Sequence, residues 1–89
     1  MFEARLEDVA QTTGTIDYGD AWKLNEHANA DKNFRKKVRE ALALYEDAAI
    51  EGDAVVMEEA GNQLKVLVKE IDEKQERRIK MFTKRQKMR

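Results

Sequence analysis

The sequence predicts an all-α protein: a small helical bundle built on a long antiparallel helical hairpin, which two short helices precede. Three observations lead to this fold class. The chain contains no proline and is rich in residues that favour helices, chiefly Ala, Glu, Lys, Leu and Arg. Apolar side chains recur at steps of three and four residues between Asp31 and Phe82. One tight turn, at Glu51-Gly52-Asp53, divides that stretch into two amphipathic arms.

The first arm of the hairpin is predicted over residues 32–51. Asp31 precedes it as an N-cap, because its carboxylate can accept from the free N–H groups of the first turn. Gly52 ends it, since glycine adopts the left-handed conformation at little cost. The apolar residues of this arm fall on one helical face, which is expected to be buried: Phe34, Val38, Ala41, Leu42, Tyr45, Ala48 and Ala49.

The second arm is predicted over residues 53–86, with Asp53 as its N-cap. Between Ile71 and Ile79 every residue is polar, so Lys74 or Gln75 occupies the line of the apolar stripe. Gly61 lies beside the stripe and indicates a close helix crossing, or a tolerated weak point, rather than a functional kink. The predicted stripe consists of Val56, Met57, Ala60, Leu64, Leu67, Val68, Ile71, Ile79 and Phe82.

The two arms differ in length, and this difference leaves part of the second arm without a partner. At 1.5 Å per residue the first arm spans roughly 30 Å and the second roughly 50 Å. Pairing from the Gly52 turn brings the start of the first arm opposite about residue 73. The remainder of the second helix is therefore expected to extend past its partner.

Residues 1–31 are predicted to form two short helices. The first covers residues 2–11 and buries Phe2, Leu6 and Val9; a polar loop at residues 11–15 follows. The second begins at Asp17 or Asp20, ends near Asn29, and presents Ala21, Trp22, Leu24 and Ala28. We expect Trp22, the single tryptophan, to pack on the hairpin near Phe34 or near Ile79 and Phe82. A partner-facing anchor is the alternative for Trp22.

Charge is strongly segregated along a chain whose net charge is only −1. Residues 1–31 hold two basic and seven acidic side chains, whereas residues 77–89 hold seven basic side chains and no acidic one. We expect residues 1–89 to form a single helical domain with three parts. These are an acidic N-terminal segment at 1–31, the helical hairpin at 32–76 and a basic helical extension at 77–89.

The composition argues against several kinds of site. Without cysteine there is no disulfide and no thiolate zinc site, and without serine there is no serine nucleophile. The four glycines are scattered and form no phosphate-binding loop. The single histidine, His27, is expected to be solvated or structural rather than a metal ligand. We therefore expect no enzyme, no cofactor and no metal.

No apolar run has the length that a membrane-spanning helix needs. The N-terminus also lacks the basic and apolar regions of a signal peptide. These features predict a soluble, cytoplasmic protein that does not contact a membrane.

The basic C-terminal end has two interpretations. It can pair internally with Asp17, Asp20, Glu26 and Asp31, while Ile79 and Phe82 are covered by Trp22, Leu24, Ile16 and Phe2. Alternatively, it meets another molecule. We expect a non-catalytic interaction or regulatory protein whose overhanging helix binds another protein through Arg77, Arg78, Met81, Phe82, Lys84 and Arg85. Self-association as a homo-oligomer is also expected, through coiled-coil packing of the 64–82 stripe.

A small nucleic-acid-binding protein is the alternative function. It would use the basic run from Lys32 to Arg39 together with the C-terminal helix, with contacts from Arg35, Lys36, Lys37 and Lys87. Residues 18–42 match a helix-turn-helix poorly, because Asp31 and Lys32 fall where that motif wants small or apolar residues. The acidic balance of the whole chain also argues against this alternative.

Overall fold

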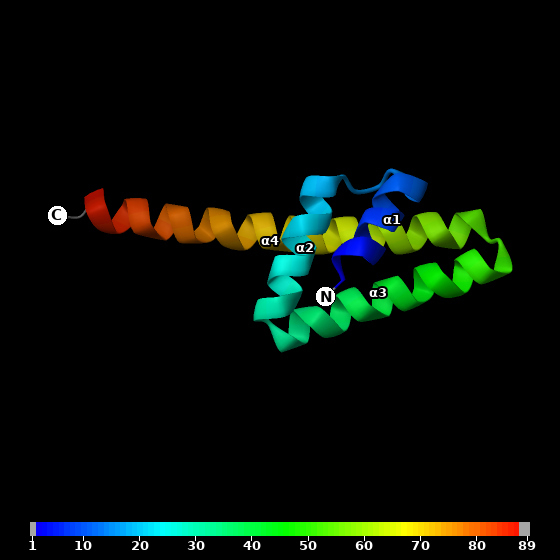
Figure 1. Ribbon diagram of the computed structural model, residues 1–89. Helices are drawn as coiled ribbons and strands as arrows, with labels where there is room; N and C mark the ends of the chain where they lie inside the picture. The colour runs from blue at the N-terminus through cyan, green and yellow to red at the C-terminus, as the bar shows by residue number, and fades with distance from the viewer. Residues whose placement is uncertain (1, 88–89) are drawn as a thin grey trace.

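The computed structural model describes the backbone of residues 2–87 and the side chains of residues 2–77. Within this part of the chain all regular structure is helical, which confirms the predicted all-α class and the long hairpin (Figure 1). The four helices are α1 (Glu3–Thr13), α2 (Tyr18–Ala30), α3 (Lys32–Glu51) and α4 (Ala54–Lys87).

The turn between α3 and α4 forms as the sequence predicts. Gly52 adopts the left-handed conformation with φ of 72°. The Gly52 amide donates to the Ala49 carbonyl at 3.3 Å and the Asp53 amide donates to the Ala48 carbonyl at 2.9 Å, which is a Schellman motif. The Asp53 carboxylate then accepts from the Val56 amide at 3.2 Å and caps α4.

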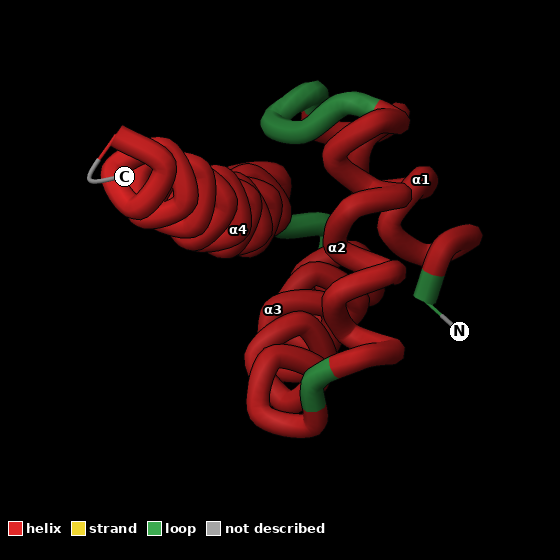
Figure 2. Tube along the Cα trace, turned by 90° about the vertical axis from the view of Figure 1, so that its left-hand side faces the viewer, coloured by secondary structure: helices red, strands yellow, loops and turns green. Residues whose placement is uncertain are grey.

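Two layers make up the bundle. Helices α3 and α4 lie side by side and antiparallel, and α1 and α2 cover one side of this pair (Figures 1 and 2). The ion pair between Lys37 Nζ and Glu70 Oε2, at 3.7 Å, shows which parts of α3 and α4 lie opposite each other. Lys37 also lines a surface groove with Glu73, Lys74 and Arg77, so α3 begins close to the predicted point on α4.

Beyond that point α4 continues with no other helix beside its backbone (Figure 1). The molecule is accordingly elongated, with principal extents of 59 × 22 × 17 Å. The overhang that the sequence predicts is therefore present as a helix.

The core lies where α1 and α2 cross the paired part of α3 and α4. Every residue predicted for the buried face of α3 is buried except Ala49, and on α4 Val56 and Met57 are only partly buried. Burial of apolar side chains stabilises the fold by roughly 25 cal/mol for each Å² removed from water. The large side chains with the least exposure are Leu6, Val9, Leu24, Val38, Leu42, Leu64, Val68 and Ile71.

Short-range caps begin α2 and α3. The Asp17 carboxylate accepts from the Asp20 amide at 2.7 Å, and the Asp20 carboxylate accepts from the Asp17 amide at 3.2 Å, which completes a capping box. The Asp31 carboxylate accepts from the amides of Asn33 and Phe34 at 2.9 and 3.2 Å. These contacts confirm Asp17 and Asp31 as the residues that start the two helices.

The predicted loop at residues 11–15 is wrong in its first part, because Gln11, Thr12 and Thr13 belong to α1. The Thr13 hydroxyl donates to the Val9 carbonyl one turn earlier at 2.8 Å, so this polar residue is accommodated within the helix. The helix ends at Gly14, whose φ of 67° breaks the helical conformation.

The predicted close approach at Gly61 is confirmed. A Cβ atom placed on Gly61 would lie 2.9 Å from the Thr13 hydroxyl oxygen and 3.2 Å from Thr15 Cβ. The element that approaches α4 here is the end of α1 with the loop after it. The absence of a side chain at Gly61 therefore allows the end of α1 and the loop after it to pack closely against α4.

The prediction that Trp22 packs on the hairpin is wrong, because 56% of this residue is exposed. Ala21, Leu24 and Ala28 form the buried face of α2, and Trp22 lies outside it. The Phe34 ring instead lies beside the ring of His27, with centroids 5.9 Å apart.

The N-terminal layer also does not cover the C-terminal end of α4 as one interpretation expected. Phe2, Ile16 and Leu24 are buried together with the core residues of the paired hairpin. Asp20 is bound to Lys65 on α4, and Asp17 and Asp31 cap helices. The predicted contacts of Ile79 and Phe82 lie outside the described side chains.

Tyr45 links α3 to α1 and gives the first testable prediction. Its hydroxyl donates to Asp8 Oδ2 at 3.1 Å, and burial raises the pKa of Tyr45 above its ordinary 10.0. We expect Tyr45→Phe to lower the free energy of unfolding by about 1 kcal/mol near neutral pH, because one hydrogen bond is lost.

The difference between Tyr45→Phe and the unchanged protein should depend on pH. The folded state favours the neutral phenol, so its contribution is complete below the unfolded pKa of 10.0 and is lost as pH rises through the higher folded pKa. Urea unfolding curves on both sides of this pH provide the measurement. A difference that stays constant into strong alkali would show that Tyr45 is not held in its neutral form by folding.

Candidate interaction surface

The C-terminal part of α4 is the first component of the candidate surface. We call residues 77–87 the overhang; they contain six basic residues and no acidic one. Their backbone is helical and extends away from the two layers (Figure 1). Arg77 is exposed. The predicted contact residues Arg78, Met81, Phe82, Lys84, Arg85 and Lys87 lie on this helix, but their side chains are outside the described ones.

The first turns of α3 are the second basic component, and part of it is engaged within the fold. Arg35 Nε donates to the Ala28 carbonyl at 2.8 Å and Arg35 Nη2 donates to the Asn29 carbonyl at 3.3 Å, so this side chain caps the end of α2. Lys37 pairs with Glu70. Two of the predicted nucleic-acid contacts therefore have structural partners.

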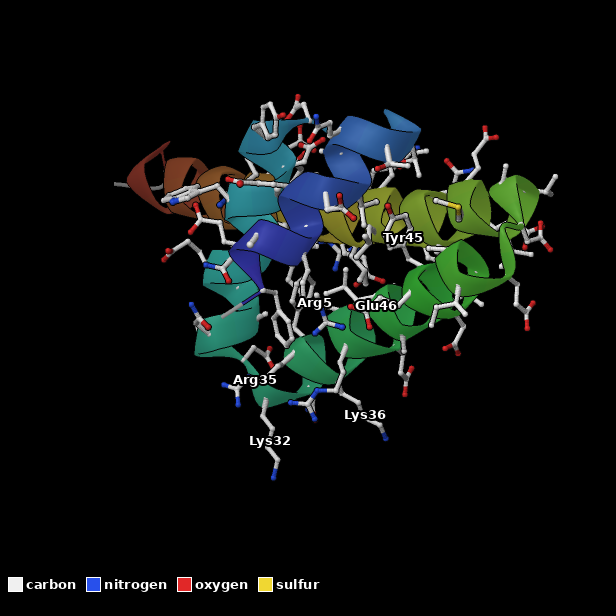
Figure 3. All side chains as sticks on the ribbon, turned by 45° about the vertical axis from the view of Figure 1, so that its right-hand side comes forward. Arg5, Lys32, Arg35, Lys36, Tyr45 and Glu46 are labelled. Atoms are coloured by element: carbon white, nitrogen blue, oxygen red, sulfur yellow. The ribbon has the colours of Figure 1, made fainter. Side chains whose placement is uncertain are left out.

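Three cations at the start of α3 remain exposed. Lys32, Lys36 and Arg39 follow one another at helical spacing, and Figure 3 shows Lys32 and Lys36 pointing away from the bundle. This part of α3 lies at the same end of the bundle as the overhang (Figure 1). The two basic components are therefore neighbours in space although they are far apart in sequence.

The opposite end of the bundle is acidic. Residues 40–63, which include the turn between α3 and α4, contain seven acidic residues and no basic one. Among the described side chains, Glu46 is the one of the seven that forms an ion pair, with Arg5 at 2.6 Å (Figure 3). The elongated molecule thus carries opposite charges at its two ends.

Two cations in the middle of the bundle are paired with acidic neighbours. Lys23 Nζ lies 3.2 Å from Asp72 Oδ1, and Lys65 Nζ lies 3.2 Å from Asp20 Oδ2. These contacts join α2 to α4, although partly exposed ion pairs of this kind contribute at most about 1 kcal/mol each. Among the described side chains, most exposed Lys and Arg residues without an ion pair therefore lie toward the end with the overhang.

Two exposed aromatic side chains lie on α2: Trp22, for which the sequence analysis kept a partner-facing position as the alternative, and Tyr18, which it did not place on the surface. Tyr18 and Trp22 are 61% and 56% exposed and stand one turn apart on α2. The spacing of Ala21, Leu24 and Ala28 was the signal that could have found them, because a buried face on those residues leaves Tyr18 and Trp22 outside.

The chemistry of the described side chains gives no second kind of site. Residues 2–77 contain no group of three or more His, Asp or Glu side chains that could hold a metal ion. Tyr45, whose pKa is raised by burial, lies between α1 and α3 and contacts Asp8. Within the described part of the chain, no helix combines the length and the apolar character that crossing a membrane requires.

Comparison with known proteins identified no relative of this chain. No protein-family model matches the chain, and neither a curated protein nor a solved structure is significantly similar to it. The functional proposal below therefore depends on the geometry and the charges described above.

Proposed function

We propose that this is a non-catalytic interaction or regulatory protein that binds an acidic surface of a partner protein through the overhang. The observation that carries the proposal is the basic part of α4 that extends past the start of α3 with no other helix beside it (Figure 1). Exposed cations of this kind attract an acidic partner protein over a distance and can then contact its carboxylates directly.

Local causes do not account for the charge of the overhang. The helix dipole favours cations within about the last turn of a helix. The six basic residues of the overhang are spread over about three turns, and no acidic residue follows Glu76. Because no other helix of the chain lies beside the overhang, we infer that the partner for most of these charges is another molecule (Figures 1 and 2).

The form of self-association that the sequence suggested needs correction. Leu64, Leu67, Val68 and Ile71 are between 0% and 7% exposed, so the first half of the 64–82 stripe is already covered inside one chain. Two overhangs packed against each other would also bring twelve positive charges together, which is unfavourable. Self-association remains part of the proposal only if the overhang meets an acidic surface of the second copy.

Charge reversal in the overhang tests the proposed function. We expect Lys84→Glu combined with Arg85→Glu to weaken capture of the partner protein from native lysate by more than about tenfold, because attraction becomes repulsion. Lys32→Glu combined with Lys36→Glu makes the same change of charge on the second basic component and should weaken capture less than the overhang variant does, which separates the overhang from the charge of the surface as a whole. Quantitative pull-down of one defined protein provides the measurement.

Two results would count against the proposal. If the overhang variant captures the same protein as efficiently as the unchanged chain, the overhang is not the binding element. If nuclease treatment of the lysate abolishes capture, the contact runs through nucleic acid instead.

Nucleic-acid binding is the second candidate, and one observation favours it. Lys32, Lys36 and Arg39 are exposed at the same end of the bundle as the overhang, so cations from two helices could meet one phosphate backbone. Binding of this kind should lose much of its affinity between about 50 and 200 mM salt. A gel-shift titration with duplex DNA and RNA at both salt concentrations measures this, and the Lys32→Glu, Lys36→Glu variant should then bind more weakly.

A further inference from the structure

The exposed aromatic pair on α2 is a prominent surface feature that the proposed function leaves unused. Tyr18 and Trp22 present large rings to solvent one helical turn apart, and Glu26 follows one turn later on the same face. We call Tyr18, Trp22 and Glu26 the aromatic face. Tyr and Trp are enriched at the centres of protein interfaces, where their rings give up contact with water.

The charges around the aromatic face are acidic. Asp17 precedes Tyr18, and both Asp17 and Glu26 are exposed. Lys23 is the single Lys or Arg between residues 17 and 31, and its ammonium group is bound to Asp72 on α4. The aromatic face thus combines electron-rich rings with carboxylates and has no unpaired Lys or Arg of its own. Lys and Arg side chains of another molecule would be attracted both to the rings and to the carboxylates.

The chain itself supplies a helix with the complementary chemistry. The overhang holds six basic residues and no acidic one, and no helix of its own chain lies beside it. We infer that the aromatic face of one copy binds the overhang of a second copy. This inference rests on the proposed function, because it names the acidic partner surface that the overhang would recognise.

The course of α4 argues against binding within one chain. This helix runs without a break from Ala54 to Lys87, and the chain contains no glycine after Gly61 and no proline. The backbone of the overhang therefore extends past α2 and away from the two layers (Figure 1). We accordingly assign the contact between the overhang and the aromatic face to two molecules.

Reciprocal binding would give a closed dimer. Each copy has one aromatic face and one overhang, so two copies related by a twofold axis can fill both sites at once. This arrangement also keeps the two overhangs apart, because each one lies against an acidic surface. The positive charge of the overhang opposes direct pairing of two overhangs. In the reciprocal dimer the same charge is attracted to the aromatic face of the other copy.

The single tryptophan makes the inference directly measurable. Because Trp22 belongs to the proposed contact, raising the protein concentration at low salt should shift its fluorescence to shorter wavelength while sedimentation shows a change from monomer to dimer. Added salt should reverse both changes. Sedimentation of Trp22→Ala should show dimerisation more than about tenfold weaker, as expected for an aromatic side chain at the centre of an interface.

Two further variants separate this contact from general effects. Glu26→Lys puts a cation on the aromatic face and should also weaken dimerisation by more than about tenfold, through repulsion. Ile50→Ala is the matched control, because Ile50 is 84% exposed at the other end of the bundle and should leave dimerisation unchanged. Circular dichroism should show the same helix content in all of them, since the three changed side chains are exposed.

The possible failures can be told apart. A chain that stays monomeric at every concentration, or a Trp22→Ala variant that dimerises like the unchanged protein, overturns the inference. If the overhang variant still loses capture of another protein in that case, the proposed function stands without it. If the overhang variant both dimerises and captures normally, the proposed function fails as well.

Discussion

Leu64→Ala is expected to lower the free energy of unfolding by about 2–5 kcal/mol, the range typical of a leucine removed from a protein core. Leu64 has no exposed surface and belongs to the core shared by all four helices. Helices on both sides fix the space around it, so the cavity left by the substitution can collapse only in part. A chain of 89 residues is stabilised by roughly 5–10 kcal/mol in total, so the loss is large.

Val66→Ala is the matched control for this prediction. Val66 stands half a turn away on the same helix and is 55% exposed, so its truncation should change stability by no more than about 0.5 kcal/mol. Thermal unfolding followed by circular dichroism should give a midpoint that is more than about 10 °C lower for Leu64→Ala. Equal effects at the two positions would show that α4 presents a different face to the core.

Gly61→Ala is the second substitution expected to have a large effect on the free energy of unfolding, and two opposing contributions decide whether it stabilises or destabilises the fold. Inside an ordinary helix this change stabilises by roughly 1 kcal/mol, because alanine is the better helix former. Here the added Cβ would stand 2.9 Å from the Thr13 hydroxyl oxygen and 3.2 Å from Thr15 Cβ, which is too close. We expect a net loss of about 1–3 kcal/mol, since the end of α1 must move away from α4.

Two comparisons make the Gly61 prediction specific. Asn62→Ala, one residue along α4 and exposed, should be neutral or slightly stabilising by about 0.5 kcal/mol. Thr15→Ala removes the hydroxyl that lies nearest to the new methyl group, so the double variant with Gly61→Ala should lose less than the two single losses together. Strict additivity in urea unfolding would mean that Thr15 does not limit the space at Gly61.

The hairpin could be predicted from sequence almost to the residue, because local signals mark both of its ends. Asp31 caps the start of α3, and the Gly52 turn both ends α3 and places Asp53 at the start of α4. The apolar spacing then specifies which face is buried. These signals act between residues close together in the chain, so no knowledge of the rest of the fold is needed.

The position of the N-terminal layer could not be predicted in the same way. Whether α1 and α2 cover the paired hairpin or the end of α4 depends on contacts between distant residues, such as Thr15 with Gly61 and Phe2 with Asn25. Nothing in local spacing encodes those contacts. The misplacement of Trp22 has a related cause, because the sequence analysis grouped it with Ala21, Leu24 and Ala28, whereas Trp22 lies outside the face that packs.

The candidate surface was predicted in part. The charge of the overhang is a property of composition and is visible in the sequence, as is the length of α4 relative to α3. That Arg35 and Lys37 are engaged by Ala28 and Glu70 required the folded arrangement. For the aromatic face, the spacing of Ala21, Leu24 and Ala28 was an available signal, but tertiary packing confirms which side of α2 is exposed to solvent.

The turn at Gly52 also controls the rotational phase of α4. Asp53 is at once the last residue of the motif that closes α3 and the cap that opens α4, so no spacer separates the two helices. One residue inserted between them would rotate every later side chain by about 100° around the axis of α4. Leu64 and Val68 would then point toward water, so natural variants of this chain should tolerate changes of residue type at the turn far better than changes of its length.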